Sequence, residues 1–328
     1  MKALVVNKIG DTPDMRVEIR DIPSLKPGYS LIKIHAATVN PLSNLVRLGL
    51  LPSVEAPLVL SNDGSGIIVK SDIYSVGQRV AIYGGGSLGI TEDGLQQQYA
   101  LVENRWIFSI DDSISLDDAA ALPINYVSAY QAIHRVGQLQ PGQIALISGA
   151  TGSLGHALIQ LTNAMGATPI AIVSSSAKIS NALQSGAHAV VDLSSQDLDF
   201  EVQNFTAGQG ADFAFDSVGG DVLGRMLNVL KTRGTLVSIG FVGGTSPTID
   251  VVDLIVKEKR LLGFDAHLET DEDVEKVFDA LKVLINKKKI KPRIDSVYEL
   301  EQHQMAYQRL NSRQAQGTIL LSLNENKE

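Results

Sequence analysis

The sequence predicts an α/β protein that combines a doubly wound parallel sheet with a second, β-rich domain. Strand-like and helix-like patterns alternate over residues 142–241, which is typical of parallel strands joined by crossover helices. Before Ser115, short apolar runs are separated by turn residues, which indicates an antiparallel, barrel-like domain. The length of 328 residues exceeds one typical domain and is enough for two cores.

The composition is that of a globular protein with an acidic surface. Hydrophobic residues make up 44%, charged residues 20%, and the formal net charge is −8. Such a surface repels phosphate backbones and anionic lipid, so nucleic-acid and membrane partners are disfavoured. The first residues hold too short an apolar run for a signal peptide, and no stretch approaches the roughly 18 apolar residues of a membrane helix. We therefore expect a cytoplasmic protein.

The β-rich part is expected to begin with short strands. These strands span residues 2–6, 29–37, 66–70 and 78–83. Residues 26–28 (Lys-Pro-Gly) and 62–64 (Asn-Asp-Gly) are turn signals between them. Residues 84–94 are glycine-rich without an apolar period, which predicts a loop.

Helices begin near Ser115, which is a good N-cap followed by two carboxylates in the first helical turn. A second helical run over residues 126–136 ends at Gly137. The alternating part then predicts strands 144–148, 169–174, 189–193, 211–216 and 235–241, and helices 154–165, 179–184 and 222–231. The tail predicts an amphipathic helix over residues 271–286 and a last strand over residues 317–323.

Residues 149–155 (Gly-Ala-Thr-Gly-Ser-Leu-Gly) form a glycine-rich turn between a predicted buried strand and a predicted helix. Gly152 lets the backbone approach a pyrophosphate, and Gly155 lets the helix pack against the strand. The free N–H groups and the dipole of the helix then face the anion. We predict a dinucleotide site here. The alternative is an ordinary strand-to-helix turn, because a glycine pattern alone is weak evidence.

The residues after the second strand of this part indicate which dinucleotide binds. An NAD-preferring site usually has a carboxylate about 20 residues after the glycine turn, where it bonds the ribose. This chain instead has Ser174, Ser175 and Lys178 there. Hydroxyl groups and a positive charge suit a 2′-phosphate, so we predict NADPH. The alternative is that Lys178 only begins the next helix at the surface.

The absence of cysteine excludes disulfides, thiolate zinc sites and cysteine nucleophiles. No two histidines are spaced as ligands on one helix face. They are His35, His134, His156, His188, His267 and His303. The chain therefore has too few plausible ligands for a catalytic zinc, and we expect no metal.

Several segments, by their order and spacing, resemble one family. They are residues 38–41 (Thr-Val-Asn-Pro), 62–66 (Asn-Asp-Gly-Ser-Gly), 76–80 (Val-Gly-Gln-Arg-Val), 119–123 (Ala-Ala-Ala-Leu-Pro), 150–155, 215–220 (Phe-Asp-Ser-Val-Gly-Gly) and 236–240 (Leu-Val-Ser-Ile-Gly). The chain resembles the zinc-free quinone oxidoreductase-like branch of the medium-chain dehydrogenase/reductase superfamily. The resemblance implies a GroES-like catalytic domain (1–122 and 266–328) around a Rossmann nucleotide-binding domain (123–265). It also implies a homodimer joined edge to edge through the nucleotide-domain sheets.

The resemblance assigns roles to residues of this chain. Asn40 matches an asparagine near the nicotinamide, and Arg313 resembles a C-terminal basic residue that reaches the cofactor phosphate, although a solvated loop cation is the alternative. The remaining cofactor residues are Ser128, Ala150, Thr151, Gly152, Ser153, Leu154, Ser174, Ser175, Lys178, Ser217, Val218, Gly240, Phe241 and Val242.

The activity implied by the resemblance is zinc-independent hydride transfer from NADPH to a quinone or another electrophilic carbonyl acceptor. Asn40 would hold the geometry by hydrogen bonding, and Tyr130 or solvent would supply a proton; Tyr130 is otherwise a helix-packing aromatic. Leu45 and Leu50 or Leu51 stand where relatives carry tyrosines, and Ser43 where they carry an acid. The acceptor pocket is therefore expected to be more apolar.

Two other functions fit the same resemblance. The first is an enoyl or enone reductase, which differs in its product. The second is an NADPH-binding regulatory or RNA-binding protein without turnover, against which the net charge of −8 and the absence of interleaved basic and aromatic clusters argue.

Overall fold

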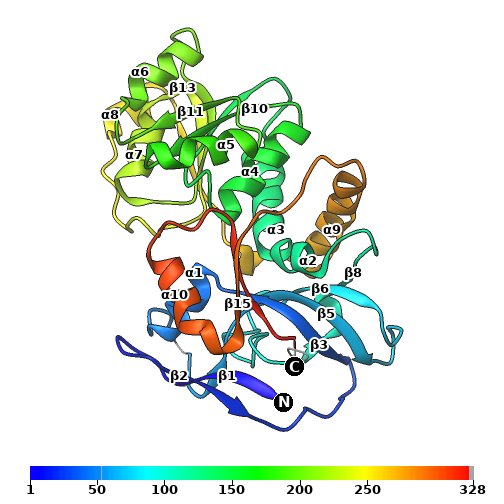
Figure 1. The fold of residues 1–328 in the computed structure, drawn as a ribbon. Helices are drawn as coiled ribbons and strands as arrows, with labels where there is room; N and C mark the ends of the chain where they lie inside the picture. The colour runs from blue at the N-terminus through cyan, green and yellow to red at the C-terminus, as the bar shows by residue number, and fades with distance from the viewer. Residues whose placement is uncertain (53, 325–328) are drawn as a thin grey trace. The chain divides into compact units, whose positions relative to one another are not determined.

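The computed structural model describes residues 1–52 and 54–324. Residue 53 and residues 325–328, which belong to the expected ranges 1–122 and 266–328, lie outside the described residues. The chain forms two compact units, which are described separately (Figure 1). The first unit comprises Met1–Ile124, Ala266–Phe278 and the chain from Pro292 onward, and the second comprises Asn125–Asp265 and Asp279–Lys291.

The segment Asp279–Lys291 lies in the second unit, whereas the expected boundaries assign it to the first. Hydrogen bonds at its end give the reason. The backbone N–H of Lys291 donates to the side chain of Gln160 (2.9 Å), and the carbonyl of Lys291 lies 2.8 Å from Nε2 of His156. Gln160 and His156 both lie on the helix that follows the glycine turn, so the second unit holds this returning segment.

The second unit is built on a six-stranded, entirely parallel sheet. Its strands are β9 (Ile144–Ile147), β10 (Thr168–Val173), β11 (Ala189–Asp192), β12 (Ala211–Asp216), β13 (Leu230–Ser238) and β14 (Arg260–Gly263). They lie side by side in the order β11-β10-β9-β12-β13-β14. The chain therefore winds outward in one direction and then in the other, and the direction reverses between β9 and β12. This is the doubly wound order expected from the sequence.

Helices cover this sheet (Figure 1). They are α3 (Pro123–Gln131), α4 (Ser153–Ala164), α5 (Ile179–Gln184), α6 (Leu198–Phe205), α7 (Gly220–Asn228) and α8 (Val251–Val256). Helix α4 packs on β9 and β10, α5 packs on β10 and β11, and α7 packs on β12 and β13. The core between them is formed mainly by Leu, Ile, Val and Ala side chains, because the central strands β9, β10 and β12 are buried on both faces.

The first unit is mainly antiparallel. A seven-stranded sheet runs β15-β16-β3-β5-β6-β8, with β7 also paired to β3, and a second sheet runs β2-β1-β4. The strands are β1 (Lys2–Lys8), β2 (Asp14–Ile19), β3 (Tyr29–Thr38), β4 (Leu58–Val59), β5 (Asp63–Lys70), β6 (Arg79–Tyr83), β7 (Tyr99–Glu103), β8 (Ile107–Ser109), β15 (Ile294–Glu299) and β16 (Thr318–Ser322). The helices that begin in this unit are α1 (Pro41–Arg47), α2 (Leu116–Ala121), α9 (Asp271–Asn286) and α10 (His303–Asn311). Both ends of the chain contribute strands to one sheet, so the fold class expected from the sequence is confirmed.

Several expected elements differ in the structure. The strand expected over residues 235–241 spans Leu230–Ser238 as β13. The turn expected at residues 62–64 is wrong, because β5 begins at Asp63. Gly64 lies there because its backbone packs closely on β3, where a Cβ would meet the carbonyl oxygen of Ala36 at 2.5 Å. The helix expected over residues 222–231 ends at Asn228, and its last residues open β13. The helical run expected over residues 126–136 continues from α3 as a π-helical turn over Ala132–Gly137. Among the residues that the model describes, no helix has the length and apolar character needed to span a membrane.

Candidate functional site

The carboxyl ends of β9 and β12 meet where the strand order of the second unit reverses. Parallel sheets bind ligands at this point because no strand covers the crevice beyond it. A buried pair joins the two strand ends: the hydroxyl of Ser148 donates to the carboxylate of Asp216. The same carboxylate accepts the backbone N–H groups of Val218 (3.0 Å) and Gly219 (2.9 Å). These hydrogen bonds fix the loops that follow β9 and β12 at the end of the sheet.

The glycines of the turn after β9 have three different roles. Gly149 has φ +57°, and a Cβ on it would lie 2.4 Å from Oγ of Ser217. A Cβ on Gly155 would lie 2.2 Å from the carbonyl oxygen of Gly149, so helix α4 packs directly on the turn. Gly152 has an ordinary φ of −72°, and its nearest neighbour beyond the adjoining residues would lie 3.3 Å from such a Cβ. The space in front of Gly152 therefore remains for another molecule.

The N-terminus of α4 fits the phosphates of a dinucleotide. This helix has twelve residues, and its N-cap, Gly152, provides no side chain to accept the first N–H groups. A pyrophosphate would meet these donors and the positive end of the helix dipole. Ala150 and Thr151 are buried within the turn, while Ser153 and Leu154 are half-buried at the start of the helix.

The loops after β12 and β13 lie against this turn. A Cβ on Gly240 would meet the carbonyl oxygen of Ser217 at 2.5 Å, and the N–H of Gly243 donates to the carbonyl of Val218 (2.6 Å). Phe241 and Val242 follow with exposed side chains. The structure thus brings together the residues expected from three separate strand ends.

The residues expected to bind a 2′-phosphate lie just beyond β10. Nζ of Lys178 donates to Oγ of Ser174 (3.1 Å), and burial lowers the pKa of Lys178. Ser175 is half-buried between them in the chain. The neighbouring strand ends in a carboxylate, Asp192, which the register places beside Val173. This carboxylate is already occupied, because it accepts the backbone N–H (2.9 Å) and the hydroxyl (2.7 Å) of Ser194.

Helix α3 carries the two other residues expected in the second unit. Ser128 is buried. Tyr130 is half-buried and stacks on the imidazole of His134, with 4.0 Å between ring centroids. Burial raises the pKa of Tyr130 and lowers the pKa of His134. The raised pKa makes the Tyr130 phenol a weaker acid than an ordinary tyrosine, so this shift does not favour Tyr130 as the proton donor.

Asn40 lies in the first unit, at the N-terminus of α1, within a buried polar cluster. Its Nδ2 donates to Oγ1 of Thr38 (2.8 Å) and to Oδ1 of Asp63 (2.8 Å), and the hydroxyl of Thr38 also donates to Asp63. Burial raises the pKa of Asp63 to about 7. These bonds engage the amide nitrogen of Asn40, and its Oδ1 remains an acceptor for another group.

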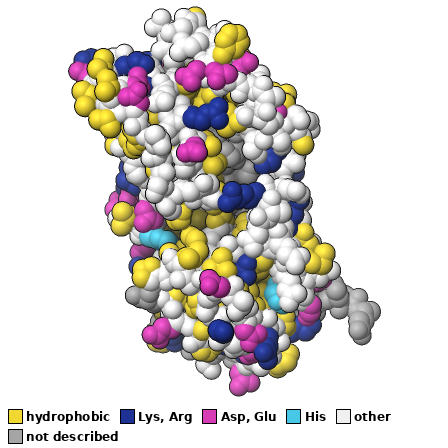
Figure 2. Space-filling model, turned by 90° about the vertical axis from the view of Figure 1, so that its left-hand side faces the viewer, with side chains coloured by type: hydrophobic (Ala, Val, Ile, Leu, Met, Phe, Trp, Pro, Cys, Tyr) yellow, Lys and Arg dark blue, Asp and Glu magenta, His cyan; other side chains and the backbone are white. Residues whose placement is uncertain are grey.

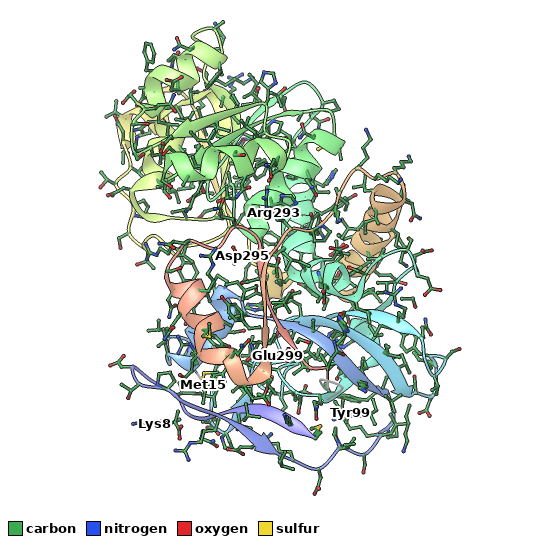
Figure 3. All side chains as sticks on the ribbon, in the orientation of Figure 1. Lys8, Met15, Tyr99, Arg293, Asp295 and Glu299 are labelled. Carbon is green, nitrogen blue, oxygen red and sulfur yellow. The ribbon has the colours of Figure 1, made fainter. Side chains whose placement is uncertain are left out.

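Arg313 lies in the loop between α10 and β16, with an exposed side chain and φ +56°. This loop is fixed by Asp295 on β15, which is labelled in Figure 3. The carboxylate of Asp295 accepts the guanidinium of Arg309 (2.7 Å) and the backbone N–H of Gln316 (2.7 Å). The first unit therefore holds Asn40 and Arg313, and the second holds the other expected cofactor residues.

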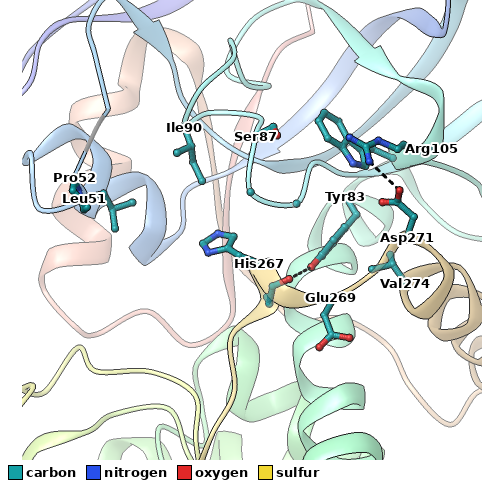
Figure 4. Close-up of a pocket in the computed structure, with 14 residues that line it drawn as sticks. Leu51, Pro52, Tyr83, Ser87, Ile90, Arg105, His267, Glu269, Asp271 and Val274 are labelled. Atoms are coloured by element: carbon teal, nitrogen blue, oxygen red, sulfur yellow. Dashed lines mark hydrogen bonds and ion pairs between the residues drawn. The ribbon is translucent and has the colours of Figure 1, made fainter.

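The first unit also contains a cavity of about 550 Å³ (Figure 4). Segments far apart in the chain line it, including the loop after β6 and the start of α9. Its apolar residues include Leu51, one of the leucines at which a tyrosine was expected in relatives. Its polar residues include Arg105, His267, Glu269 and Asp271, so the cavity is mixed rather than purely apolar.

Two family models match the chain. The model for the alcohol dehydrogenase GroES-like domain matches residues 26–112, and the model for zinc-binding dehydrogenase matches residues 153–282. A quinone oxidoreductase-like protein 2 homolog from Nematostella vectensis is 30% identical over 301 residues, which cover 89% of this chain and 80% of that protein. The chain belongs to the quinone oxidoreductase-like branch of the medium-chain dehydrogenase/reductase superfamily.

Further similarities agree with this family. A 2-haloacrylate reductase from a Burkholderia species is 26% identical over 97% of this chain and 98% of its own length. A mycobacterial protein solved in complex with NADPH has a TM-score of 0.87 at 23% identity, over 98% of this chain and 99% of that chain. The similarity to the mycobacterial protein, at 23% identity, shows the fold alone.

Several residues of this dehydrogenase/reductase site were not expected from the sequence. Thr38 and Asp63, which bind Asn40, lie within segments that resemble the family, but the resemblance assigned no role to either residue. Ser148 and Asp216 are each the last residue of a predicted strand. This shared position was the signal that could have paired them. Within the described ranges 1–52 and 54–324, no group of three His, Asp or Glu side chains is placed to hold a metal ion.

Proposed function

We propose that this chain is a zinc-independent, NADPH-dependent oxidoreductase that reduces a quinone or another electrophilic carbonyl acceptor. The observation that carries the proposal is the pairing of Lys178 with Ser174 beside the glycine turn, where an NAD-preferring site would have an accessible acid. When bound, NADPH supplies a hydride to the acceptor.

The residues of the second unit would bind and orient the dinucleotide. The N–H groups at the start of α4 would donate hydrogen bonds to the pyrophosphate, and Gly152 leaves the space for it. Lys178 and Ser174 would bind the 2′-phosphate, with Ser175 beside them. Ser128, Ser217, Val218, Gly240, Phe241, Val242 and Arg313 stay predicted contacts.

Asn40 would act as an acceptor through its Oδ1. Thr38 and Asp63 hold the amide nitrogen and thereby fix the direction of Oδ1. This oxygen suits a hydroxyl or amide N–H of the nicotinamide riboside. A quinone needs no metal to accept a hydride, and the chain has no cysteine to serve as a zinc ligand. Tyr130 or solvent would supply the proton.

An enone reductase is the second candidate within the same chemistry. It is favoured by one relative, the 2-haloacrylate reductase, because a haloacrylate is an α,β-unsaturated carbonyl compound. The third candidate is an NADPH-binding regulatory or RNA-binding protein without turnover. On the face shown in Figure 2, basic and acidic side chains are interspersed, which does not favour a nucleic-acid partner for that face.

The homodimer stays a proposal, and β14 is the edge at which we place it. Among the described strands, β14 pairs with β13 alone. The preceding helix α8 exposes Val251, Val252, Ile255 and Val256. Figure 2 shows exposed apolar side chains gathered at the upper left of the molecule. The cytoplasmic location stays a prediction.

The cofactor preference is tested by comparing KM for NADPH and NADH. The unmodified protein is expected to prefer NADPH. Lys178→Ala should raise KM for NADPH by roughly tenfold or more, since it removes a charge-assisted contact, and leave KM for NADH nearly unchanged. Lys282→Ala is the matched control, because Lys282 pairs with Asp279 on α9, away from the sheet end. Equal KM values for both cofactors in the unmodified protein would contradict the proposal.

The reaction is tested by following NADPH oxidation with a panel of quinones and enones. Turnover on quinones with hydroquinone as product supports the proposal, and a saturated carbonyl product supports the enone reductase. Asn40→Ala is expected to lower the rate. Tight NADPH binding without turnover on any acceptor would favour the binding protein instead.

A further inference from the structure

A second, smaller pocket of the first unit lies between α10, the end of α1 and the start of β2. Its volume is about 210 Å³, below the roughly 300–1,000 Å³ that is typical of sites for drug-sized molecules, so it suits a small ligand. Met15 on β2, labelled in Figure 3, and Arg47 on α1 line it together with residues of α10. It shares no lining residue with the cavity of about 550 Å³.

The lining of this pocket carries a positive charge and no negative one. Among the described lining residues, Arg47 is the only one with a full charge when histidine is neutral, and none is an aspartate or a glutamate. The acids nearest to the lining in the sequence are paired elsewhere: Asp14 with Arg16 (2.9 Å) and Glu301 with Lys2 (2.6 Å). The pocket is therefore cationic, although the whole chain has a net charge of −8.

Arg47 is half-buried at the end of α1 without an acidic partner. Its Nε donates to Oδ1 of Asn44 (2.9 Å), and the guanidinium lies over the ring of Tyr307, 4.6 Å from the ring centroid. Among the described residues, its two Nη groups make no hydrogen bond or ion pair. Burial lowers the pKa of Arg47, because the charge has lost part of its water. Nη groups available at a pocket wall suit the oxygens of a phosphate or carboxylate.

His303 supplies a second polar group at the wall of the pocket. It is 8% exposed, and its Nδ1 lies 3.2 Å from the carbonyl of Leu300. Since a carbonyl only accepts, Nδ1 carries the proton of the neutral ring and Nε2 is an acceptor. This buried Nε2 makes no hydrogen bond of normal geometry with a described residue. Burial lowers the pKa of His303, although the carbonyls of Leu300 and Met15 oppose that shift. The pocket therefore offers donors at Arg47 and an acceptor at His303.

We propose that this pocket binds a small oxyanion that keeps a hydroxyl group, with inorganic phosphate as its simplest form. The anionic oxygens would accept hydrogen bonds from Arg47, and the P–O–H group would donate to Nε2 of His303. The exposed amides of Gln308 and Asn311, on the same side of α10, would bind the outer oxygens. The pocket contains none of the residues expected to bind the dinucleotide, so this inference goes beyond the proposed function.

Calorimetric titration of the full-length protein with inorganic phosphate tests the site. Ionic strength is held constant with potassium chloride, because salt screens the attraction between an anion and a partly exposed cation. Sulfate is the matched anion, since it has the same shape but no O–H group at neutral pH. We expect saturable binding of phosphate, with sulfate at least roughly tenfold weaker because it leaves Nε2 of His303 without a donor.

Two variants assign the binding to this pocket. Arg47→Met keeps an unbranched chain beside Tyr307 and should weaken phosphate binding by at least roughly tenfold. Gln308→Glu adds a carboxylate to the pocket at an exposed position that does not disturb the core, and it should weaken binding by roughly threefold or more. The controls lie outside the lining: Arg16→Met removes an exposed arginine of β2, and Met305→Glu adds a carboxylate at an exposed position of α10. Both should bind phosphate almost as the unmodified protein does.

Three outcomes would overturn the inference. They are the absence of saturable phosphate binding, equal affinities for phosphate and sulfate, and phosphate binding that Lys178→Ala weakens while Arg47→Met and Gln308→Glu leave it unchanged. The last outcome would assign the anion to the predicted dinucleotide site of the second unit. The titration needs neither NADPH nor turnover, so its result is distinguishable from failure of the proposed function.

Discussion

At the scale of single residues, Asp63 is a buried ionisable group of the first unit that several hydrogen bonds hold in place. It is fully buried and accepts hydrogen bonds from Thr38, Asn40 and the backbone N–H of Ile124. No lysine, arginine or histidine bonds it among the described residues. Burial without a cation raises the pKa of Asp63 from its ordinary 3.8 to about 7. The group that orients Asn40 therefore changes charge near neutral pH.

Asp63 should make the stability of the protein depend on pH. The folded state keeps a proton on Asp63 up to about pH 7, whereas the unfolded chain loses it near pH 4. The free energy of unfolding should therefore fall as pH rises from about 4 to about 7, by at most about 1.4 kcal/mol per pH unit for this one proton. Asp63→Asn should remove that part of the slope. Denaturant unfolding at pH steps between 4 and 8 measures it.

The control for this experiment is Asp112→Asn. The side chain of Asp112 is 97% exposed and lies 3.4 Å from the guanidinium of Arg79. The slope between pH 4 and pH 7 should remain in this variant. A slope that is identical in Asp63→Asn and in the unmodified protein would show that Asp63 titrates normally in the folded state.

At the scale of elements, the junction between the glycine turn and α4 is the tightest backbone contact of the second unit's site. Gly155 lies on the first turn of α4, where the helix touches the carbonyl of Gly149 and the Cα of Ala150. The helix can therefore direct its N–H groups at the turn only if residue 155 has no side chain. The same contact would position the dinucleotide and stabilise the sheet end.

Gly155→Ala should cost stability and cofactor binding together. The added Cβ would lie 2.2 Å from a backbone oxygen, so the turn or the helix must move. We expect the free energy of unfolding to fall by roughly 1–3 kcal/mol, the usual cost of overpacking. NADPH binding, measured by calorimetry, should weaken by at least roughly tenfold.

Gly263→Ala is the matched control for the glycine turn. Gly263 ends β14 in the same unit, has no positive φ, and has no atom within 4 Å of an added Cβ. It should leave stability and NADPH binding nearly unchanged. Normal NADPH binding by Gly155→Ala would contradict the proposed cofactor position.

At the scale of the whole molecule, the exposed apolar helix α8 and the edge strand β14 predict self-association. Ile255 is 69% exposed. Ile255→Asp should convert a dimer to a monomer, because a carboxylate at an apolar contact must lose its hydration without a partner. Sedimentation velocity over a range of concentrations measures this change.

The control for self-association is Phe200→Asp, since Phe200 is 64% exposed on α6 and belongs to another surface. It should remain dimeric. A monomeric unmodified protein, or a dimeric Ile255→Asp variant, would contradict the interface at β14.

Sequence alone determined the features that arise from neighbouring residues. The strand, glycine turn and helix over residues 144–165 were predicted because their signals are local: a buried apolar run, glycines at fixed spacing, and a helical period. The contact of Lys178 with Ser174 spans four positions and follows from the same local geometry. The parallel order of the sheet followed from the alternation of strands and helices.

Only the tertiary structure decided the features that depend on register and long loops. Asp63 reaches Asn40 across 23 positions, and Ser148 reaches Asp216 across 68, because paired strands bring their ends together. The cavity combines residues near positions 51, 85, 105 and 270, none of which carries a local signal for the others. The sequence pattern does not specify such contacts, because a shift of one residue in strand register would turn each side chain to the opposite face of the sheet.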